Sequence, residues 1–561
     1  MLSEGILNSH SNFKWEGKGK TLELPVITID EVEDKESSHE DIESNRKVPR
    51  NLSSRHIQFM ALGAAIGTGL FISSGTALVT CGPAPLLISY LITSYFVWTV
   101  MNQLMEMVNL IPLSGETSLF TLALKYTNSP IALTVGWNLL FAQLVVSPTE
   151  ITACAMCIKY WTLANVAIFI SIFWVASVAV SCSSVRILGE SEFLTSLAKI
   201  CCCTGLIILG VVLFFGGGPD QHEVLGFHYW KLPGAFKEYL VPGNTGKFLA
   251  TWTAIIKSAY AFVLVPEALT TTAAESRNPR RDMPKAGNRF VFRLIFFYVL
   301  CILAITVMVA WDNKELNDAI NKGTSNAASS PFVVGVSSAG IKVLPHIINA
   351  CIIISAYLAG TVQMYASSRS LYSMSLKGFA PKLFSITKRG KPVYSECVLA
   401  IFGVLAYINC SDSGAKGFSD LSSVTSISGF INWIFVGITY LRYRKALKYH
   451  GLDKAVPYRP PLQIFGACFI IFFFILITFT NGYNIFFPKE WEVSGFFVSY
   501  VSVGFVIVLF VGGAIYFGTV RFNNPEDMPI KYQLDVVEAQ TRKITERQPK
   551  NIWEKIWFFV V

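Results

Sequence analysis

The sequence predicts an all-α, polytopic membrane protein with twelve transmembrane helices, and three observations support this fold class. Apolar residues make up 52% of the 561 positions and charged residues only 15%, whereas a soluble protein carries roughly a quarter charged residues. The mean hydropathy is +0.48. The apolar residues are also gathered into blocks of about 20, the length that a helix needs to cross the hydrocarbon core of a bilayer.

Twelve such blocks follow one another and define a transmembrane domain over residues 51–520. They cover residues 57–79, 86–110, 131–158, 163–183, 193–216, 250–273, 289–311, 333–365, 394–408, 424–442, 464–484 and 496–519. The ninth block is the shortest. Residues 1–50 are polar and lack an apolar segment, so no cleavable signal peptide is expected.

The distribution of basic residues predicts the orientation of these spans. Arginine and lysine are concentrated in the connections that follow spans 6, 8 and 10, whereas residues 217–249 and 312–330 carry as many or more acidic residues as lysines. Because connections rich in basic residues stay in the cytosol, both termini are predicted to be cytosolic. The net charge of +9 therefore reflects topology, and no nucleic-acid partner is expected.

Two cytosolic tails flank the transmembrane domain. Residues 1–50 form the N-terminal tail, in which the acidic stretch 29–43 has too few apolar residues to fold, so disorder is expected. The tail lysines are candidate ubiquitin acceptors for ubiquitin ligase machinery, or plain surface lysines: Lys18, Lys20 and Lys35. The C-terminal tail, residues 521–561, ends in NIWEKIWFFVV, which is typical of a short helix at the membrane interface.

The sequence contains no signature of an enzyme or a metal site. No HExxH motif occurs, and no pair of aspartates lies within the spans. Cys154 and Cys157 form a CxxC pair without a second pair, so they are interpreted as buried apolar residues and not as metal or redox ligands. His346 has no obvious partner. An enzymatic activity is therefore not expected.

Ionisable residues within the spans are the strongest functional candidates, since each costs roughly 2.5–3.5 kcal/mol or more at the middle of a bilayer. Glu150 lies in span 3, Lys199 in span 5, and Lys257 and Glu267 in span 6. Lys257 is interpreted as reaching the interface with its long side chain, as is Glu106 near the end of span 2. For Lys199, a structural anchor and a functional cation both stay open.

Two spans contain residues that disfavour a continuous helix. Span 1 has Gly67, Thr68 and Gly69 at its centre, and span 6 has Pro266 followed by Glu267. Interrupted spans five apart are the mark of a transporter with inverted five-helix repeats, here followed by two extra C-terminal spans. The amides of residues 66–69, including Ile66, would bind a substrate carboxylate at a half-helix N-terminus. Close helix packing is the alternative explanation of the glycines.

Several motifs resemble those of the fungal amino acid permease family, which belongs to the amino acid–polyamine–organocation superfamily. They are HIQFMALGAAIGTGLF, LGESEF, AESRNPRRDMPKA, AGIKVLPHIINACI and SSRSLYSM, in order between about residues 50 and 520. Within the family the likeness is closest to fungal proline permeases, in RLIFFYVL, LGFHYWKLPGAF and ITFTNGYNIFFPKEW. The resemblance implies a LeuT-like fold and a proton-coupled importer of the plasma membrane, with the proton gradient in place of a cofactor.

The resemblance also implies roles for individual residues. The first-span motif of the family falls on Gly67, Thr68 and Gly69, the span 6 acid on Glu267, and an aromatic gate on Phe262.

Two further positions are implied to take part in proton coupling. They are Glu150, the span 3 acid, and Lys199, at whose position related bacterial transporters have a lysine that occupies the place of a sodium ion. The sequence departs from the family pattern at Val265, where proline permeases tend to have glycine, and at residues 64–65. Val265 is expected to face the substrate and to narrow the pocket.

Three functions stay open at this point. The first is proton-coupled import of proline and related small neutral amino acids. The second is a permease for basic amino acids or for a broad range of them. The third is a sensor that binds amino acids without moving them, although such sensors usually have a longer cytosolic tail than the 50 residues here. Two carboxylates alone do not indicate a basic substrate, because the family has acids at these positions in members of both kinds.

Overall fold

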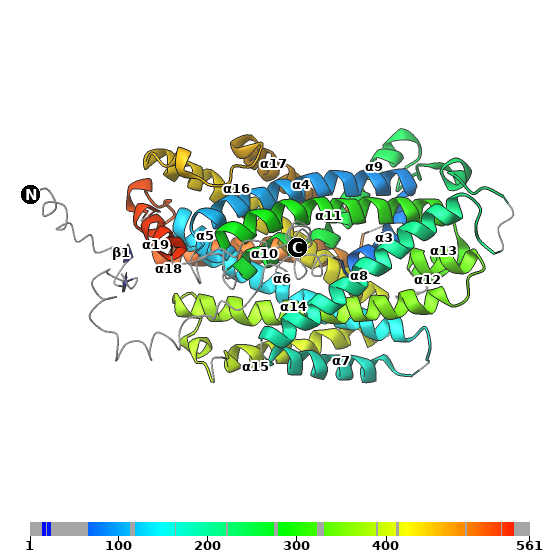
Figure 1. Cartoon of the computed structure of the whole chain (residues 1–561), viewed down its shortest axis with the longest axis horizontal. Helices are drawn as coiled ribbons and strands as arrows, with labels where there is room; N and C mark the ends of the chain where they lie inside the picture. The colour runs from blue at the N-terminus through cyan, green and yellow to red at the C-terminus, as the bar shows by residue number, and fades with distance from the viewer. Residues whose placement is uncertain are drawn as a thin grey trace, which may run out of the picture.

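The computed structural model describes residues 14–17, 20–23, 66–112, 118–162, 164–183, 185–219, 223–273, 279–321, 330–388, 391–410, 414–488, 491–528 and 530–542. Most of these residues are helical, and the long helices run side by side along one axis (Figure 1). In the N-terminal tail, β1 (Lys14–Gly17) pairs antiparallel with β2 (Lys20–Glu23). The acidic stretch 29–43 lies outside the described residues.

Eight helices in the described part are long and apolar enough to cross a membrane. They are α4 (Pro83–Leu110), α6 (Ser129–Ile158), α8 (Val185–Phe214), α9 (Gly243–Ser258) with its continuation to Thr270, α14 (Leu344–Leu376), α16 (Gly414–Tyr449), α17 (Gln463–Thr480) and α18 (Val493–Phe517). This is the architecture of a multi-pass membrane protein, as the composition predicts.

Four shorter apolar helices accompany them. They are η2 (Gly69–Ser73) with α3 (Ser74–Cys81), α7 (Val166–Ser181), the second half of α11 (Pro279–Met308), and α15 (Val393–Phe402) with the 3₁₀ segment η7 (Gly403–Cys410).

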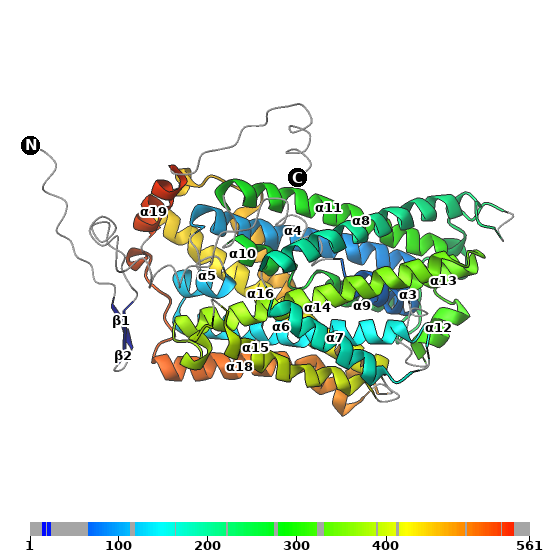
Figure 2. The ribbon, with the colours of Figure 1, turned by 60° about the horizontal axis from the view of Figure 1, so that its bottom comes forward.

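Short helices cover the two ends of the bundle. They are α5 (Leu119–Tyr126), α12 (Lys314–Asn321), α13 (Pro331–Ser338) and α19 (Ile530–Arg542), together with the turns η3 (Trp230–Gly234), η6 (Lys382–Ser385), η8 (Asp453–Ala455), η9 (Tyr483–Phe486) and η10 (Pro525–Asp527). Figures 1 and 2 both show α5 and α19 at one end of the long axis and α12 and α13 at the other.

Local sequence signals mark several helix boundaries. Gly82 has a φ of 88° and separates α3 from α4, which starts with proline in its first turn; glycine adopts this backbone conformation without the steric cost that other residues carry. The side chain of Asn128 accepts a hydrogen bond from the Ile131 amide at 2.9 Å and caps α6. Asn165 caps α7 in the same way through the Ala167 amide. These side chains satisfy amides that have no partner within the helix.

Three predicted boundaries need comment. The predicted span 333–365 is wrong as one helix: residues 331–338 form α13, the chain turns at Gly340 with a φ of 81°, and α14 then runs from 344 to 376. Pro345 lies in the first turn of α14, where its missing N–H costs nothing. The first part of span 1, residues 57–65, and the predicted interfacial helix at the C-terminus lie outside the described residues.

The long helices pack in two groups. In the first, α4 packs along both α9 and α11; in the second, α6 packs along α14 and α7 (Figure 1). Helix α16 contacts both groups through α4 and α6. The segments η2 and η4 (Ala259–Phe262) contact each other.

The sixth span is interrupted, as its proline predicts. Helix α9 ends at Ser258, the 3₁₀ turn η4 follows, and α10 (Val265–Ala273) begins only after two non-helical residues. Val263 is extended and Leu264 has a φ of 65°, which a leucine rarely adopts. Pro266 lies in the first turn of α10, where its missing N–H leaves no helical hydrogen bond unmade.

Candidate functional site

A pocket lies where the start of η2 meets the interruption between α9 and α10. Its lining residues are Gly67, Gly69, Val146, Glu150, Tyr260, Ala261, Val263, Ala359, Gln363 and Thr425. They come from the start of η2, from the turn between α9 and α10, and from α6, α14 and α16. The pocket has a volume of about 400 Å³, counting its open mouth.

Glu150 connects these elements. Its side chain on α6 is only 5% exposed, and its Oε1 accepts hydrogen bonds from the Thr68 hydroxyl at 2.6 Å and from the Tyr260 hydroxyl at 3.2 Å. The backbone of Thr68 also interacts with this carboxylate. One buried carboxylate therefore holds the start of η2 and the turn η4 together at the wall of the pocket.

Residues 66–69 are placed by close contacts with three helices. Ser355 on α14 donates a hydrogen bond to the Ile66 carbonyl at 2.8 Å, and Tyr90 on α4 donates to the Gly69 carbonyl at 3.3 Å. The Gly67 carbonyl accepts from the amides of Leu70 and Phe71. Gly67 and Gly69 line the pocket, and they lie at the start of η2, where the first amides of a helix have no partner within the helix.

Gly69 allows the start of η2 to touch the turn η4. A Cβ atom on Gly69 would lie 2.6 Å from the Cα and 2.9 Å from the Cβ of Ala261. A Cβ on Gly67 would lie 3.8 Å from both carboxylate oxygens of Glu150, which is ordinary contact. The packing of η2 against η4 therefore requires a residue without a side chain at position 69. Close packing, the alternative explanation of the glycines, thus applies to Gly69, which also lies in the pocket lining.

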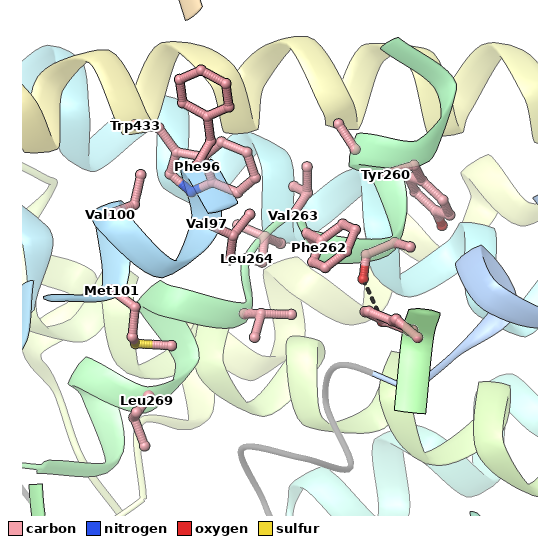
Figure 3. Close-up of a cluster of buried hydrophobic side chains, with 14 of the residues drawn as sticks. Phe96, Val97, Val100, Met101, Tyr260, Phe262, Val263, Leu264, Leu269 and Trp433 are labelled. Carbon is pink, nitrogen blue, oxygen red and sulfur yellow. Dashed lines mark hydrogen bonds between the residues drawn. The ribbon is translucent and has the colours of Figure 1, made fainter. Parts of the chain in front are cut away.

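Five of the seven predicted substrate-binding residues lie outside the pocket lining. Ile66 and Thr68 are fully buried beside it, and the other three lie in or after the turn η4. Phe262 is fully buried, with its ring 4.7 Å from that of Tyr298 and 5.8 Å from that of Tyr90. Figure 3 shows Leu264 beside Val97 of α4, whereas Tyr260 lies on the far side of Phe262 and points away from them.

Val265 and Glu267, at the start of α10, are 2% and 1% exposed, and the Glu267 carboxylate faces the Trp433 indole of α16. The 3₁₀ turn and the extended Val263 rotate the chain. The pocket is therefore lined by Tyr260, Ala261 and Val263 and not by the predicted residues of this segment.

Lys199 lies on α8, away from the lining but within the electrostatic reach of Glu150. Its side chain is 2% exposed, and its Nζ lies 4.0 Å from Oε1 of Glu192 on the same helix. Lys257, interpreted as reaching the interface, donates instead to the Thr80 hydroxyl at 3.1 Å.

The same interpretation is wrong for Glu106, which is fully buried. It accepts hydrogen bonds from Tyr440 and, at 2.9 Å, from Arg444, both on α16. Within the described part of the chain, no three His, Cys, Asp or Glu side chains are grouped so that they could hold a metal ion.

Sequence reasoning missed Tyr260, Gln363 and Thr425, the polar lining residues that bear no charge. A charge within an apolar span is conspicuous, whereas a tyrosine, glutamine or threonine there is common. The available signal was position: Tyr260 precedes the Pro266 interruption by less than two turns. Glu192 was also missed, although it lies within the LGESEF motif.

A pocket with one buried carboxylate, located where the start of η2 meets the interruption between α9 and α10 inside a bundle of membrane helices, is typical of a membrane transport protein. The amino acid permease family model matches residues 56–524. The chain belongs to the amino acid permease family, whose members are transporters and not enzymes.

The most similar curated relatives that we compared are proline permeases. The proline-specific permease of Emericella nidulans is 42% identical over 93% of this chain and 94% of its own length. The proline-specific permease of Saccharomyces cerevisiae is 42% identical over 89% of this chain and 81% of its own length. The probable proline-specific permease of Schizosaccharomyces pombe is 41% identical over 88% and 90%.

Proposed function

We propose that the protein is a proton-coupled importer of proline and related small neutral amino acids. The observation that carries this proposal is the Glu150 carboxylate at the pocket wall, hydrogen-bonded to both Thr68 at the start of η2 and Tyr260 in the turn η4. A substrate ammonium would pair with this carboxylate, and the substrate carboxylate would face the amides at the start of η2. The names of the three relatives support proline as the substrate.

The pocket lining favours a neutral side chain over a basic one. Val146, Ala261, Val263 and Ala359 are apolar, and Glu150 is the only charged residue among the lining residues. A basic amino acid would need a second carboxylate for its side chain, but Glu267 faces Trp433 outside this lining. The lining therefore supports the neutral substrate, and the basic or broad-range alternative is left to the competition experiment below.

The finer architecture is part of the proposal. The eight long and four shorter apolar helices lie in the order of the twelve predicted spans. Helices α4 and α11 are the second spans of the two proposed five-helix repeats, and α6 and α14 are the third spans. The helices of each pair pack together, as expected near the axis of a LeuT-like inverted repeat.

We place the protein in the plasma membrane with both termini, and hence α5 and α19, on the cytosolic side. The N-terminal lysines would there be accessible to ubiquitin ligase machinery.

A competition panel tests the substrate class. The chain is expressed in cells that lack their own permeases, and uptake of radiolabelled proline is measured against excess proline, 4-aminobutyrate or arginine. We expect proline to compete fully, 4-aminobutyrate partly and arginine hardly at all. Strong competition by arginine would favour the basic alternative, and surface expression with binding but no uptake would favour a sensor.

Two valines near the interruption test which side chain shapes the pocket. Val263 lines the pocket and Val265 does not. Val263→Ala removes apolar contact with the substrate, worth about 0.8 kcal/mol for each methylene equivalent, so we expect several-fold changes in the uptake of 4-aminobutyrate relative to proline. Val265→Ala is the matched control and should keep the order of substrates. If Val265→Ala changed the order and Val263→Ala did not, the substrate would lie on the α10 side of the turn.

Lys199→Ala tests proton coupling. If Lys199 carries or senses the proton, the variant loses accumulation against a gradient, while exchange of internal for external proline survives because exchange requires no net proton movement. The measurement compares net uptake and exchange in the same preparation. Concentrative uptake with an unchanged pH profile would show that Lys199 is only an anchor.

A further inference from the structure

Helix α8 has one buried face, and this face is unusually polar. The rest of the helix carries exposed apolar side chains such as Leu194, Leu197, Ile208 and Val211. The buried face is formed by Leu188, Glu192, Thr195, Ser196, Lys199, Cys203 and Leu206, at spacings of one to four residues. A helix that faces lipid gains nothing from four polar residues on its inner face, so their presence there indicates a function.

Two of these residues form a buried ion pair. The Glu192 side chain is 0% exposed, the Lys199 side chain is 2% exposed, and Oε1 and Nζ are 4.0 Å apart. Neither carboxylate oxygen of Glu192 has a hydrogen-bond partner among the described residues. An ionised carboxylate that is dehydrated and accepts no hydrogen bond is costly, so Glu192 is a suitable place for a proton to be held.

Lys199 lies between two carboxylates. It interacts electrostatically with Glu192 towards the start of α8 and with Glu150 at the pocket wall. Cys154 on α6 and Cys203 on α8 itself also act electrostatically on Lys199. Lys199 thus interacts both with the carboxylate at the pocket wall and with Glu192.

An apolar cluster lies next to Glu192 on the side nearer the start of α8. Leu188, one turn before Glu192, packs with Val362 and Tyr365 of α14 and with Val180 of α7. This Leu188 cluster separates Glu192 from the α7–α8 connection, which the proposed orientation places in the cytosol. A proton held at Glu192 would be shielded from the cytosol until α7, α8 and α14 move apart.

We propose that Glu192 is the inner proton acceptor of the transport cycle, a role that rests on the proposed proton coupling. One N–H bond of the Lys199 ammonium breaks and an O–H bond forms on the Glu192 carboxylate, which leaves a neutral amine and a carboxylic acid. Transfer requires the lysine to move about 1 Å closer, to hydrogen-bond distance. When the Leu188 cluster opens, the Glu192 acid releases its proton to cytosolic water and the carboxylate is restored.

Glu192→Gln tests this role in proteoliposomes that contain the purified full-length protein. Glutamine preserves the size of the side chain and removes its proton-accepting carboxylate. We expect proline exchange at equal pH to persist, while net accumulation driven by a pH gradient is lost together with its dependence on internal pH. Glu192→Asp, which keeps a carboxylate, should restore part of the net accumulation. Glu190→Gln is the matched control: Glu190 lies two residues away outside the buried face, and its variant should behave as the unmodified protein.

Four outcomes would overturn the proposal. Normal net accumulation in Glu192→Gln, with the internal pH dependence retained, would mean that the carboxylate only offsets the lysine charge. Equal loss of exchange and net accumulation would mean that Glu192 holds the fold. If Lys199→Ala uncoupled transport and Glu192→Gln did not, the proposed function would stand and only the role of Glu192 would fail. If net accumulation by the unmodified protein did not depend on the pH gradient, both the proposed proton coupling and the proposed role of Glu192 would be wrong.

Discussion

Replacing Gly69 with alanine is expected to lower proline uptake strongly while the protein still reaches the cell surface. The new methyl group would lie 2.6 Å from the Cα of Ala261, a distance at which either η2 or the turn η4 must move. Overpacking of this kind costs roughly 1–3 kcal/mol, and because the contact joins two segments that must move during transport, we expect uptake to fall at least about tenfold. Uptake and surface abundance are measured in the same cells.

Gly205 provides the control, because it is a glycine within α8 at which an added Cβ meets nothing within 4 Å. Gly205→Ala should therefore transport proline normally. If Gly69→Ala and Gly205→Ala took up proline equally well, close contact between η2 and η4 would not be needed for transport. The substrate site would then lie elsewhere in the protein.

The second large effect is expected for Thr68→Val, which keeps the shape of the side chain and removes its hydroxyl. The Glu150 carboxylate would lose its 2.6 Å hydrogen bond in a site where it is 5% exposed. A hydrogen bond to a charged group is worth about 1.5–3 kcal/mol, so the initial rate of proline uptake should fall about ten- to a hundredfold.

Thr68→Ser is the matched variant, since serine restores the hydroxyl and removes only a methyl group. We expect it to retain most of the activity. If valine and serine were equally active, the bond between Thr68 and Glu150 would not matter for transport; if they were equally inactive, the methyl group would be the important part of the side chain.

The bilayer explains why much of the fold could be predicted. A membrane span must be apolar and about 20 residues long, so α4, α6, α17 and α18 were placed within a few residues of their observed ends. Signals weaken where helices leave the membrane. The separation of α13 from α14 depends on a turn at Gly340, and α5 and α19 are too short to show as apolar blocks.

The site could be predicted where its chemistry is conspicuous in a membrane. Glu150 and the glycines of span 1 stood out because a charge and a flexible backbone are both costly in lipid, and the structure brings Gly67, Gly69 and Glu150 to one pocket. The side chains after Ser258 could not be assigned from helical spacing, because η4 is a 3₁₀ turn and Leu264 has a positive φ. Phe262 and Val265, which the family resemblance indicated, lie outside the lining, whereas Tyr260 and Val263 line the pocket.

Accumulation of radiolabelled proline by proteoliposomes that contain the purified protein is the most direct measurement of the proposed function. With an inward proton gradient, proline should accumulate above its external concentration, and a protonophore should abolish this accumulation. Excess arginine should leave it unchanged. Equilibration without accumulation, or accumulation of arginine in preference to proline, would contradict proton-coupled import of a small neutral amino acid.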